Sequence, residues 1–247
     1  MTIFKNIFGR IWALWAMISF ILTFLIIFIP SMIPYLLPDP KGQDLFIRIS
    51  RFWMRVWLLL VGCPLRVNGK QHFAKGTSYI VTCNHNSLLD IPISCPFIPG
   101  ANKTIAKTSF AKVPLFGWFY RKGAVLVDRK SDISRRKSFD TMKKVLAMGM
   151  HMSVYPEGTR NRSNEPMKKF YDGAFKLAVA TNTAVIPAII FNTKKALPVN
   201  KPFFFWPHRL QMDFLQPVPV EGQTAEQLRE KVFSIMKDFY VQHSTKN

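Results

Sequence analysis

The sequence predicts an α/β fold: a mixed, mostly parallel sheet flanked by helices and preceded by a two-helix N-terminal segment. Two observations predict it. After residue 63, short apolar and β-branched runs alternate with helical patterns, as in sheets that are covered by helices. Before residue 64, a long apolar run is followed by an amphipathic one. We therefore divide the 247 residues into an N-terminal segment, 1–63, and an α/β domain, 64–247.

The first predicted helix covers residues 11–29, which carry no charge. A helix of that length extends roughly 28 Å, close to the thickness of about 30 Å of a bilayer's hydrocarbon core. Pro30, Pro34, Pro38 and Pro40 are predicted to break the chain after it. A signal peptide is the competing interpretation, but the run is long and no small-x-small cleavage site follows it. The run is therefore interpreted as a membrane anchor.

The second predicted helix, residues 45–61, is amphipathic, with Arg48, Arg51 and Arg55 on one face. This pattern is typical of a helix at an anionic membrane surface, where arginines meet lipid phosphates and tryptophans occupy the headgroup zone. Two topologies remain open: the first helix spans the membrane, or both helices form a hairpin in one leaflet. We favour the hairpin, because the proline-broken turn and the basic second helix return the chain to its starting surface. A buried helix of a soluble core is the disfavoured alternative.

Basic residues outnumber acidic ones by 34 to 14, which gives a formal net charge of +20. Such a charge favours an anionic partner: nucleic acid, an anionic membrane or a phosphorylated substrate. The three cysteines form no C-x-x-C pair and no metal-like cluster with the five histidines. We therefore expect reduced thiols in a cytosolic domain and no metal site.

The α/β domain ends in the helix with the clearest start. Thr224 and Gln227 form a capping box ahead of residues 225–242. In sheets of this kind, functional side chains collect at the carboxyl ends of the strands. The predicted strands are residues 65–68, 79–83, 103–106, 124–128, 152–155, 184–191 and 210–214, and the other predicted helices are residues 91–96, 109–119, 134–148 and 172–181.

Polar residues follow the second predicted strand, in the order Asn84, His85, Asn86, Ser87 and, after two leucines, Asp90. A carboxylate on one imidazole nitrogen fixes the tautomer and leaves the other nitrogen free to take a proton. This spacing is one residue beyond the same-face helical spacing, so a turn that becomes helical just after His85 is needed. His85 is thus a candidate general base for a substrate hydroxyl, and a surface hydrogen bond is the alternative. Ser87 is a weaker candidate nucleophile, because no Gly-x-Ser-x-Gly elbow surrounds it.

Two cations, Lys107 and Arg129, each lie near the end of a predicted strand, and Pro114 and Gly117 punctuate the apolar segment between them. Cations at neighbouring strand ends are able to meet over one pocket. The alternative is that both belong to the solvated basic surface.

A second polar strand end has the sequence Tyr155-Pro156-Glu157-Gly158-Thr159-Arg160. Pro156 stops strand pairing, and Gly158 permits a tight turn or close approach of a ligand. Arg160 is able to hold a phosphate through two parallel hydrogen bonds. Glu157 is expected to orient that arginine or to accept a hydrogen bond from a substrate hydroxyl.

These blocks, in this order, resemble those of the glycerolipid acyltransferase superfamily, and most closely those of bacterial 1-acyl-sn-glycerol-3-phosphate acyltransferases. Asn84, His85 and Asp90 resemble its N-H-x4-D block, and Lys107 to Arg129 resembles its second block. Residues 155–160 resemble its F-P-E-G-T-R block, with Tyr in place of Phe, and Pro187 lies in a V-I-P block.

The resemblance implies phospholipid biosynthesis at a bacterial cytoplasmic membrane, with the domain on the cytosolic side. His85 and Asp90 are the implied catalytic dyad, which passes an acyl group from acyl-CoA or acyl-carrier protein to the sn-2 hydroxyl of lysophosphatidate. No cofactor and no metal are implied. The implied substrate-binding residues are Lys107, Arg129, Glu157, Gly158, Thr159 and Arg160, and Asn84, Pro114, Gly117, Pro156 and Pro187 support the motifs.

Three alternatives remain. The same fold is able to acylate glycerol-3-phosphate or another lysolipid, including a lyso-ornithine type. A basic nucleic-acid-binding protein is suggested by the charge alone, but the sequence contains no zinc-ligand framework, helix-turn-helix or aromatic RNA platform. A non-catalytic membrane protein is disfavoured, because His85, Asp90, Glu157 and Arg160 are all intact.

Overall fold

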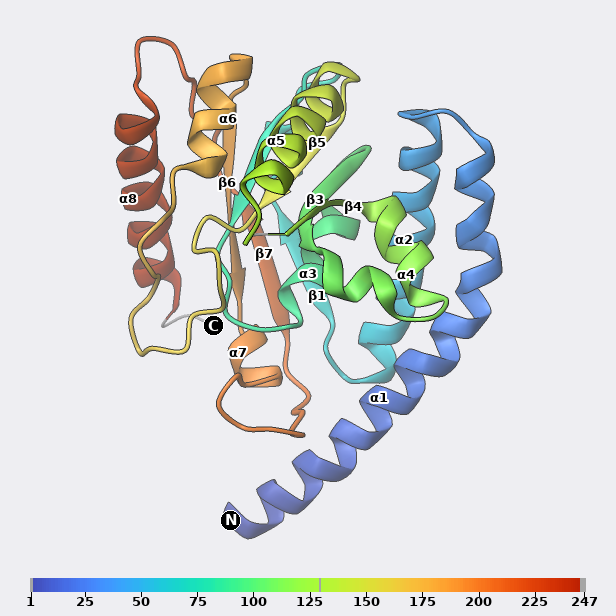
Figure 1. Cartoon of the computed structure of the whole chain (residues 1–247). Helices are drawn as coiled ribbons and strands as arrows, with labels where there is room; N and C mark the ends of the chain where they lie inside the picture. Colours follow the sequence, from blue (N-terminus) through green and yellow to red (C-terminus); the bar gives the residue numbers. More distant parts are fainter. Residues whose placement is uncertain (1, 129, 245–247) are drawn as a thin grey trace.

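The computed structural model describes residues 2–128 and 130–244 (Figure 1). The chain begins with a helical hairpin. Helix α1, Thr2–Met32, is followed by the short 3₁₀ helix η1, Ile33–Leu36, and by α2, Lys41–Leu60. Among the described residues, one helical stretch, Ile3–Leu36, is long and apolar enough to cross a membrane, with a mean hydropathy of 2.5.

The hairpin is held together by tryptophan N–H groups that bond to the facing helix. Trp57 Nε1 donates to the carbonyl of Ala16 at 3.2 Å, and Trp53 Nε1 donates to Thr23 Oγ1 at 2.9 Å. Both indoles are about 95% buried. The prediction that these rings lie in the lipid headgroup zone is therefore wrong, because they form the protein core between α1 and the sheet.

Two other expectations for this segment are corrected. Pro30 does not end the first helix, which continues for two more residues to Met32. Arg51 does not face lipid: its guanidinium donates to the carbonyls of Pro96, at 2.6 Å, and Ile98, at 2.9 Å.

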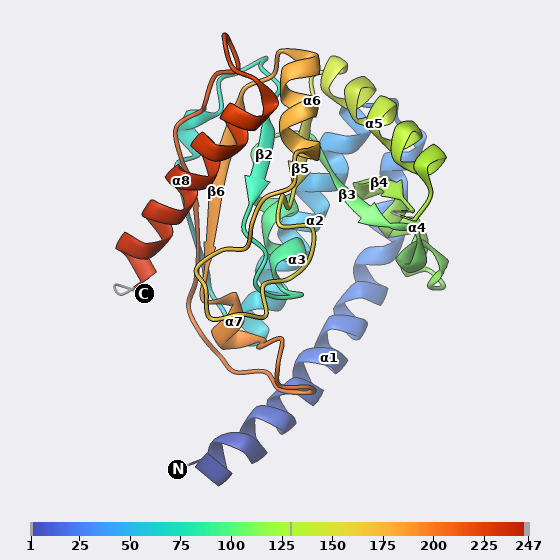
Figure 2. The same cartoon turned by 60° about the vertical axis from the view of Figure 1, so that its left-hand side comes forward.

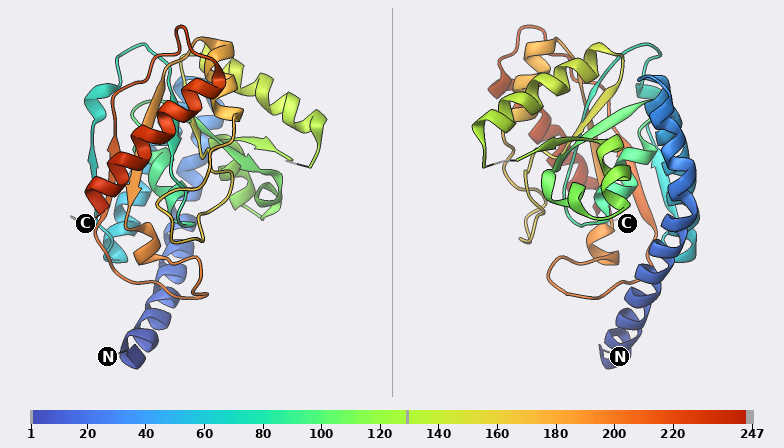
Figure 3. Two further views of the ribbon diagram at one scale, coloured as in Figure 1. Left: turned by 90° about the vertical axis from the view of Figure 1, so that its left-hand side faces the viewer. Right: turned by 45° about the vertical axis from the view of Figure 1, so that its right-hand side comes forward.

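The tip of the hairpin is fixed to the domain by a carboxylate between two cations. Asp39 lies 2.9 Å from Lys103 Nζ and 2.9 Å from Lys122 Nζ. The hairpin therefore lies along one side of the domain, as the right-hand view of Figure 3 shows. The division at residue 64 stays a prediction, since α2 and the sheet share one core.

The sheet has seven strands in the order β1-β7-β6-β2-β5-β3-β4, and every neighbouring pair except β6 and β7 is parallel. The prediction of a mixed, mostly parallel sheet is confirmed. The strands are β1 Leu65–Asn68, β2 Ile80–Cys83, β3 Asn102–Lys107, β4 Ala124–Val127, β5 His151–Val154, β6 Val185–Phe191 and β7 Leu210–Phe214.

Both faces of the sheet are covered, so successive residues of a central strand enter different cores. In β2, Ile80 packs with α5, α6 and α8, whereas Val81 packs with α2 and α3 (Figure 2). The helices of the domain are α3 Asp90–Ser94, α4 Phe116–Gly123, α5 Asp132–Ala147, α6 Gly173–Thr181, α7 Thr193–Ala196 and α8 Ala225–Ser244, with 3₁₀ turns η2 Lys70–His72, η3 Cys95–Phe97 and η4 Thr108–Lys112.

The capping box of α8 forms as the sequence predicts. The backbone N–H of Thr224 donates to Gln227 Oε1 at 2.9 Å, and the N–H of Gln227 donates to Thr224 Oγ1 at 3.2 Å. The predicted helix 109–119, by contrast, is split into η4 and α4 by a turn at Leu115.

Pro187 lies within the central strand β6, a position that a proline rarely occupies. The ladder with β7 reaches Ala188, and the next bridge joins Val185 to Val218. Between these two pairs, two residues of β6, 186 and 187, lie opposite three residues, 215–217, of the segment after β7, which is a bulge. A bulge tolerates proline, because the missing N–H has no regular partner there.

His151, at the start of β5, is buried as a neutral ring. Its Nδ1 accepts a hydrogen bond from the Tyr79 N–H at 3.0 Å, and burial lowers the pKa of the imidazole to about 4. An unfolded histidine titrates near pH 6.5. Stability from this group is therefore present above pH 6.5 and is lost as the pH falls through that value to 4.

We expect His151→Gln to remove this pH dependence. The unmodified protein should lose about 3 kcal/mol of unfolding free energy from this one group between pH 6.5 and 4. The variant, although less stable at pH 7, should lose correspondingly less, as measured by urea unfolding across that range. The same substitution at the more exposed His72 is the control, and parallel curves for His151→Gln and the unmodified protein would contradict the assignment.

Candidate active site

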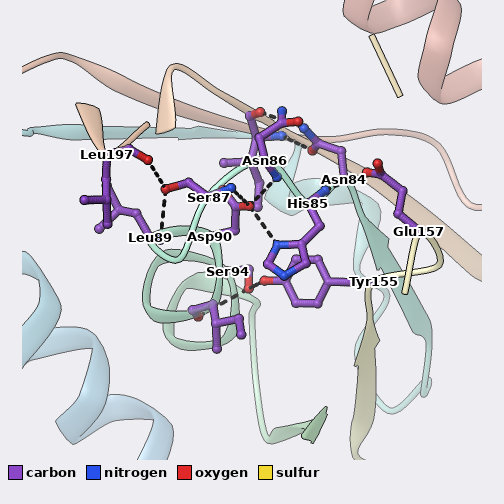
Figure 4. Close-up of polar contacts among 12 residues, drawn as sticks. Asn84, His85, Asn86, Ser87, Leu89, Asp90, Ser94, Tyr155, Glu157 and Leu197 are labelled. Atoms are coloured by element: carbon purple, nitrogen blue, oxygen red, sulfur yellow. Dashed lines mark hydrogen bonds and ion pairs between the residues drawn. The ribbon is translucent and has the colours of Figure 1, made fainter. Parts of the chain in front are cut away.

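The polar segments that the sequence singled out meet at the carboxyl edge of the sheet. Continuing the registers of the β2–β5 and β5–β3 pairs places Asn84, Pro156 and Lys107 at one level across three adjacent strands. His85 and Glu157 therefore leave neighbouring strands side by side, as Figure 4 shows.

His85 and Asp90 are in direct contact. His85 Nδ1 lies 2.9 Å from Asp90 Oδ2, and the two side chains are 13% and 0% exposed. A carboxylate only accepts hydrogen bonds, so Nδ1 carries the proton and Nε2 is left with a free lone pair. The geometry suits a base that takes a proton on Nε2.

The turn between the two residues explains how their spacing works. Asp90 Oδ2 also accepts the backbone N–H groups of Asn86, at 2.6 Å, and Ser87, at 2.7 Å. The helix α3 begins at Asp90, one residue before the predicted start at 91, so a non-helical turn joins His85 to it. Three donors on one oxygen fix the carboxylate under the ring, whereas Oδ1 is buried without a partner among the described residues.

The ring of Tyr155, which directly follows β5, packs against the imidazole of His85. Its ring centroid lies 4.5 Å from that of His85, and its hydroxyl bonds to Ser94 Oγ of α3. Sequence reasoning noted this tyrosine only as a substitute for phenylalanine. Its hydroxyl ties β5 to α3, which phenylalanine cannot do.

Glu157 connects the carboxyl ends of β2 and β5. Its Oε1 accepts the backbone N–H of His85 at 2.7 Å, its Oε2 accepts that of Lys168 at 3.0 Å, and the residue is fully buried. Burial raises the pKa of Glu157, and the two N–H donors oppose that effect. With both oxygens engaged, the carboxylate positions the His85 backbone, and its predicted contact with substrate or Arg160 stays a prediction.

Asn84 also acts on the backbone. Its side chain bonds to both the N–H and the carbonyl of Ile190, at 2.7 and 2.9 Å, which extends the pairing of β2 with β6. Ser87, the candidate nucleophile, donates its hydroxyl to the carbonyl of Leu197 at 2.7 Å. The hydroxyl therefore holds the turn in place.

The turn after β5 needs its glycine. Gly158 has a φ of +69°, and a Cβ there would lie 2.9 Å from the ring of Tyr171. Thr159 is exposed and its hydroxyl accepts from Lys168 Nζ at 2.6 Å. Pro156 accepts the N–H of Tyr171 at 2.8 Å through its carbonyl.

The predicted phosphate-binding cations lie at the same edge. Lys107 is exposed at the end of β3, and Arg160 is half-buried after β5. Neither has an ion-pair partner within residues 2–128 and 130–244. Arg129 lies outside the described residues. Pro114 and Gly117 shape the segment after Lys107, where a Cβ on Gly117 would lie 2.4 Å from the Ala111 carbonyl.

One further residue reaches the site from α8, far along the chain. Tyr240 lies near Asn86 and stacks on Phe191, with centroids 5.3 Å apart. Burial raises the pKa of this phenol, with Asp90 and Glu157 adding to the effect. No local motif marks Tyr240, so the sequence offered no signal for it.

An apolar cavity of about 430 Å³ opens beside the dyad. Leu88, Ile91 and Pro92 of the catalytic turn and α3 form one wall. The lining also includes seven aromatic residues from α1, α2, η4 and α4, namely Phe20, Phe46, Trp53, Phe110, Phe116, Phe119 and Tyr120.

The cysteines and acidic residues supply no metal site within the described part of the chain. Cys63, Cys83 and Cys95 are free thiols, and burial raises the pKa of Cys63 to about 11. They are therefore poor nucleophiles and poor metal ligands as they stand.

Comparisons with known proteins identify the family to which the chain belongs. A family model described as Acyltransferase matches residues 64–191. A 1-acyl-sn-glycerol-3-phosphate acyltransferase of Saccharomyces cerevisiae is 30% identical over 202 residues, which cover 76% of this chain and 65% of that protein. The alpha form from Homo sapiens is 30% identical over 204 residues, covering 78% of this chain and 70% of that protein.

A solved structure shares the fold over nearly the whole chain. The crystal structure of the 1-acyl-sn-glycerophosphate acyltransferase of Thermotoga maritima superposes with a TM-score of 0.78. The match covers 98% of this chain and 97% of that one, at 23% identity. The helical hairpin is thus part of the shared architecture.

Proposed function

The chain belongs to the acyltransferase family, and on this premise we propose that it acylates the sn-2 hydroxyl of 1-acylglycerol-3-phosphate to give phosphatidate. The donor is the thioester of acyl-CoA or acyl-carrier protein. The observation that carries the proposal is the contact of 2.9 Å between His85 Nδ1 and Asp90 Oδ2, which leaves Nε2 available as a base. The relatives' names supply the acceptor.

In the proposed reaction, Nε2 of His85 takes the proton of the acceptor hydroxyl while its oxygen attacks the thioester carbonyl. Asp90 stabilises the imidazolium that forms. The tetrahedral intermediate collapses, the thiolate leaves and the proton on Nε2 passes to it. General-base catalysis supplies about 10²–10⁴-fold of rate, and much of the remainder comes from positioning two bound substrates.

The acceptor phosphate is proposed to bind to Lys107 and Arg160, with Arg129, which lies outside the described residues, in support. The two described cations lie at neighbouring strand ends and have no carboxylate partners of their own in the described chain. The apolar cavity, whose wall at Leu88 and Ile91 adjoins the dyad, is proposed to hold the acyl chain. A volume of about 430 Å³ lies within the range of small-ligand pockets.

The hairpin is proposed to lie in one leaflet with the domain at the membrane surface. One face of α1 is exposed and apolar along its length, including Ile7, Ile11, Ile18 and Ile29. The opposite face packs on the domain: Phe8 and Gly9 contact residues 205–206, and from Trp12 onward the helix packs on α2 and, at Phe24, on α4. A spanning α1 would draw those elements into the hydrocarbon core, where their polar residues are costly.

The proposed function is tested by acyl transfer with purified protein. Labelled acyl-CoA is offered with lysophosphatidate, glycerol-3-phosphate or lysophosphatidylcholine in parallel reactions, and acyl-carrier protein is tried as the alternative donor. Product from lysophosphatidate alone supports the proposal. Product from another acceptor keeps the chemistry and changes the substrate, and no product with either donor would overturn it.

We expect Arg160→Ala to weaken acceptor binding selectively. Loss of a charge-assisted phosphate contact should raise the KM for lysophosphatidate by about 10–100-fold and leave the KM for acyl-CoA within about twofold. Arg162→Ala, a neighbouring exposed arginine, is the matched control. Equal losses for donor and acceptor would count against a phosphate role.

A further inference from the structure

The segment that runs from η4 through the turn at Leu115 into α4 exposes apolar side chains at the carboxyl edge of the sheet. We call residues 110–118 the insertion turn. Phe110, Val113, Leu115 and Trp118 are 49%, 45%, 45% and 60% exposed. No described part of the chain covers these exposed faces, although Ala111 and Gly117 between them are buried. Four such side chains within nine residues form a patch that favours an apolar partner.

The backbone of this turn is strained so that Leu115 points outward. Leu115 has φ 59° and ψ −55°, and the N–H of Phe116 donates to the carbonyl of Pro114 at 2.6 Å. These dihedral angles and the hydrogen bond define a γ-turn of the rarer, strained form, with a positive φ at the central residue. Glycine would adopt it at lower cost. Strain of this kind is kept where it has a function, and here it presents a leucine to the surroundings.

The insertion turn is continuous with the apolar face of the hairpin. The Trp118 ring stacks on the ring of Phe28 of α1, with centroids 6.3 Å apart. The backbone carbonyl of Trp118 accepts a hydrogen bond from the Tyr35 hydroxyl at 2.6 Å. Phe116 packs against Phe24 of α1, at 5.7 Å. Figure 1 shows α4 beside the hairpin. The exposed residues of α1 and of the turn therefore form one surface.

The same turn borders the mouth of the apolar cavity. Of the residues that line the cavity, Leu88 and Phe110 are about half exposed, so its opening lies between them. Leu88 belongs to the turn that carries His85 and Asp90. The opening thus faces the dyad on one side and the insertion turn on the other.

We propose that residues 110–118 insert into the same lipid leaflet as α1 and carry the mouth of the cavity into the acyl region of that leaflet. The acyl chain of membrane-bound lysophosphatidate then enters the cavity directly from lipid. The partner is the bilayer itself. Lys112 interrupts the apolar residues, and its long side chain reaches back to lipid phosphates. The acyl chain in this inference rests on the proposed function, whereas the insertion does not.

Insertion is tested with a fluorophore at position 115. Leu115→Cys is labelled with an environment-sensitive dye, and the full chain is bound to vesicles of phosphatidylethanolamine with a minority of phosphatidylglycerol. Met148→Cys is the control, since Met148 is 41% exposed but caps α5 on the opposite face of the sheet. The unmodified protein, with its largely buried cysteines, gives the labelling blank.

The label at 115 should shift to the blue and be quenched by doxyl groups on the lipid chains, whereas the label at 148 should show neither effect. A label at 115 that stays in water on vesicle-bound protein would overturn the insertion. This readout needs no acyl transfer, so it stands or falls separately from the proposed function.

A second variant tests the link to substrate entry. Leu115→Gly relieves the γ-turn strain, so the melting temperature in detergent should stay the same or rise. Its activity should fall at least about fivefold when lysophosphatidate is presented in vesicles, because an inserted leucine is lost. Activity in mixed detergent micelles should be unchanged. Equal activity in both, or equal loss in both, would overturn the role in substrate entry.

Discussion

His85→Ala is expected to lower the rate of acyl transfer by on the order of 10⁴-fold while leaving folding and vesicle binding unchanged. The imidazole is the titratable side chain that the Asp90 carboxylate orients toward the cavity edge. Without it, the acceptor hydroxyl has to lose its proton to water. The measurement is the initial rate with labelled acyl-CoA and lysophosphatidate at saturating concentrations of both.

The stability of this variant should change little, because the imidazole is not part of either main hydrophobic cluster. His72→Ala, the same substitution near the opposite edge of the sheet, is the matched control and should keep full activity. A His85→Ala rate within about tenfold of the unmodified protein would contradict the general-base assignment, since that catalysis contributes at least about 10²-fold.

The sequence was most informative about the sheet. Strands β1 and β7 begin and end at the predicted residues, 65–68 and 210–214. Both alternate apolar and polar residues, the pattern of a short strand, so the local sequence is informative about them. The carboxyl ends of β2 and β5 were also predicted to within one residue, and parallel pairing then brings their polar segments together.

Sequence reasoning failed where contacts between distant residues decide the environment. Arg51, Trp53 and Trp57 have the composition of a membrane-surface helix, but their partners are backbone carbonyls and side chains of α1 and η3. A pattern of cations and tryptophans does not distinguish lipid from a neighbouring helix. The same holds for Tyr240, whose contact with Asn86 joins residues far apart in the chain.

The site itself was predicted in part. The residue types of the dyad are visible in the sequence, but the way that Asp90 reaches back to His85 is not. The contact depends on the backbone N–H groups of Asn86 and Ser87, which both donate to Oδ2 of Asp90 and so hold the turn around this oxygen. Glu157 shows the same limit, because its contact with the His85 backbone spans 72 residues.

Asp90→Asn is the second change with a large expected effect, a loss of roughly 10³–10⁴-fold in kcat. The carboxylate accepts three hydrogen bonds on Oδ2, and its negative charge stabilises the imidazolium that forms in the reaction. An amide oxygen can keep the two backbone N–H bonds, but it carries no charge. Its NH₂ group would replace the buried, unpartnered Oδ1 and would have no acceptor there.

The KM values for both substrates should change little, because Asp90 is 0% exposed and touches neither. This separates loss of orientation and charge from loss of binding. Asp213→Asn provides the control: that carboxylate is also buried and hydrogen-bonded to two side-chain amides, but it lies in β7. If Asp90→Asn raised the KM while leaving kcat unchanged, Asp90 would be a binding residue and the dyad mechanism would have to be abandoned.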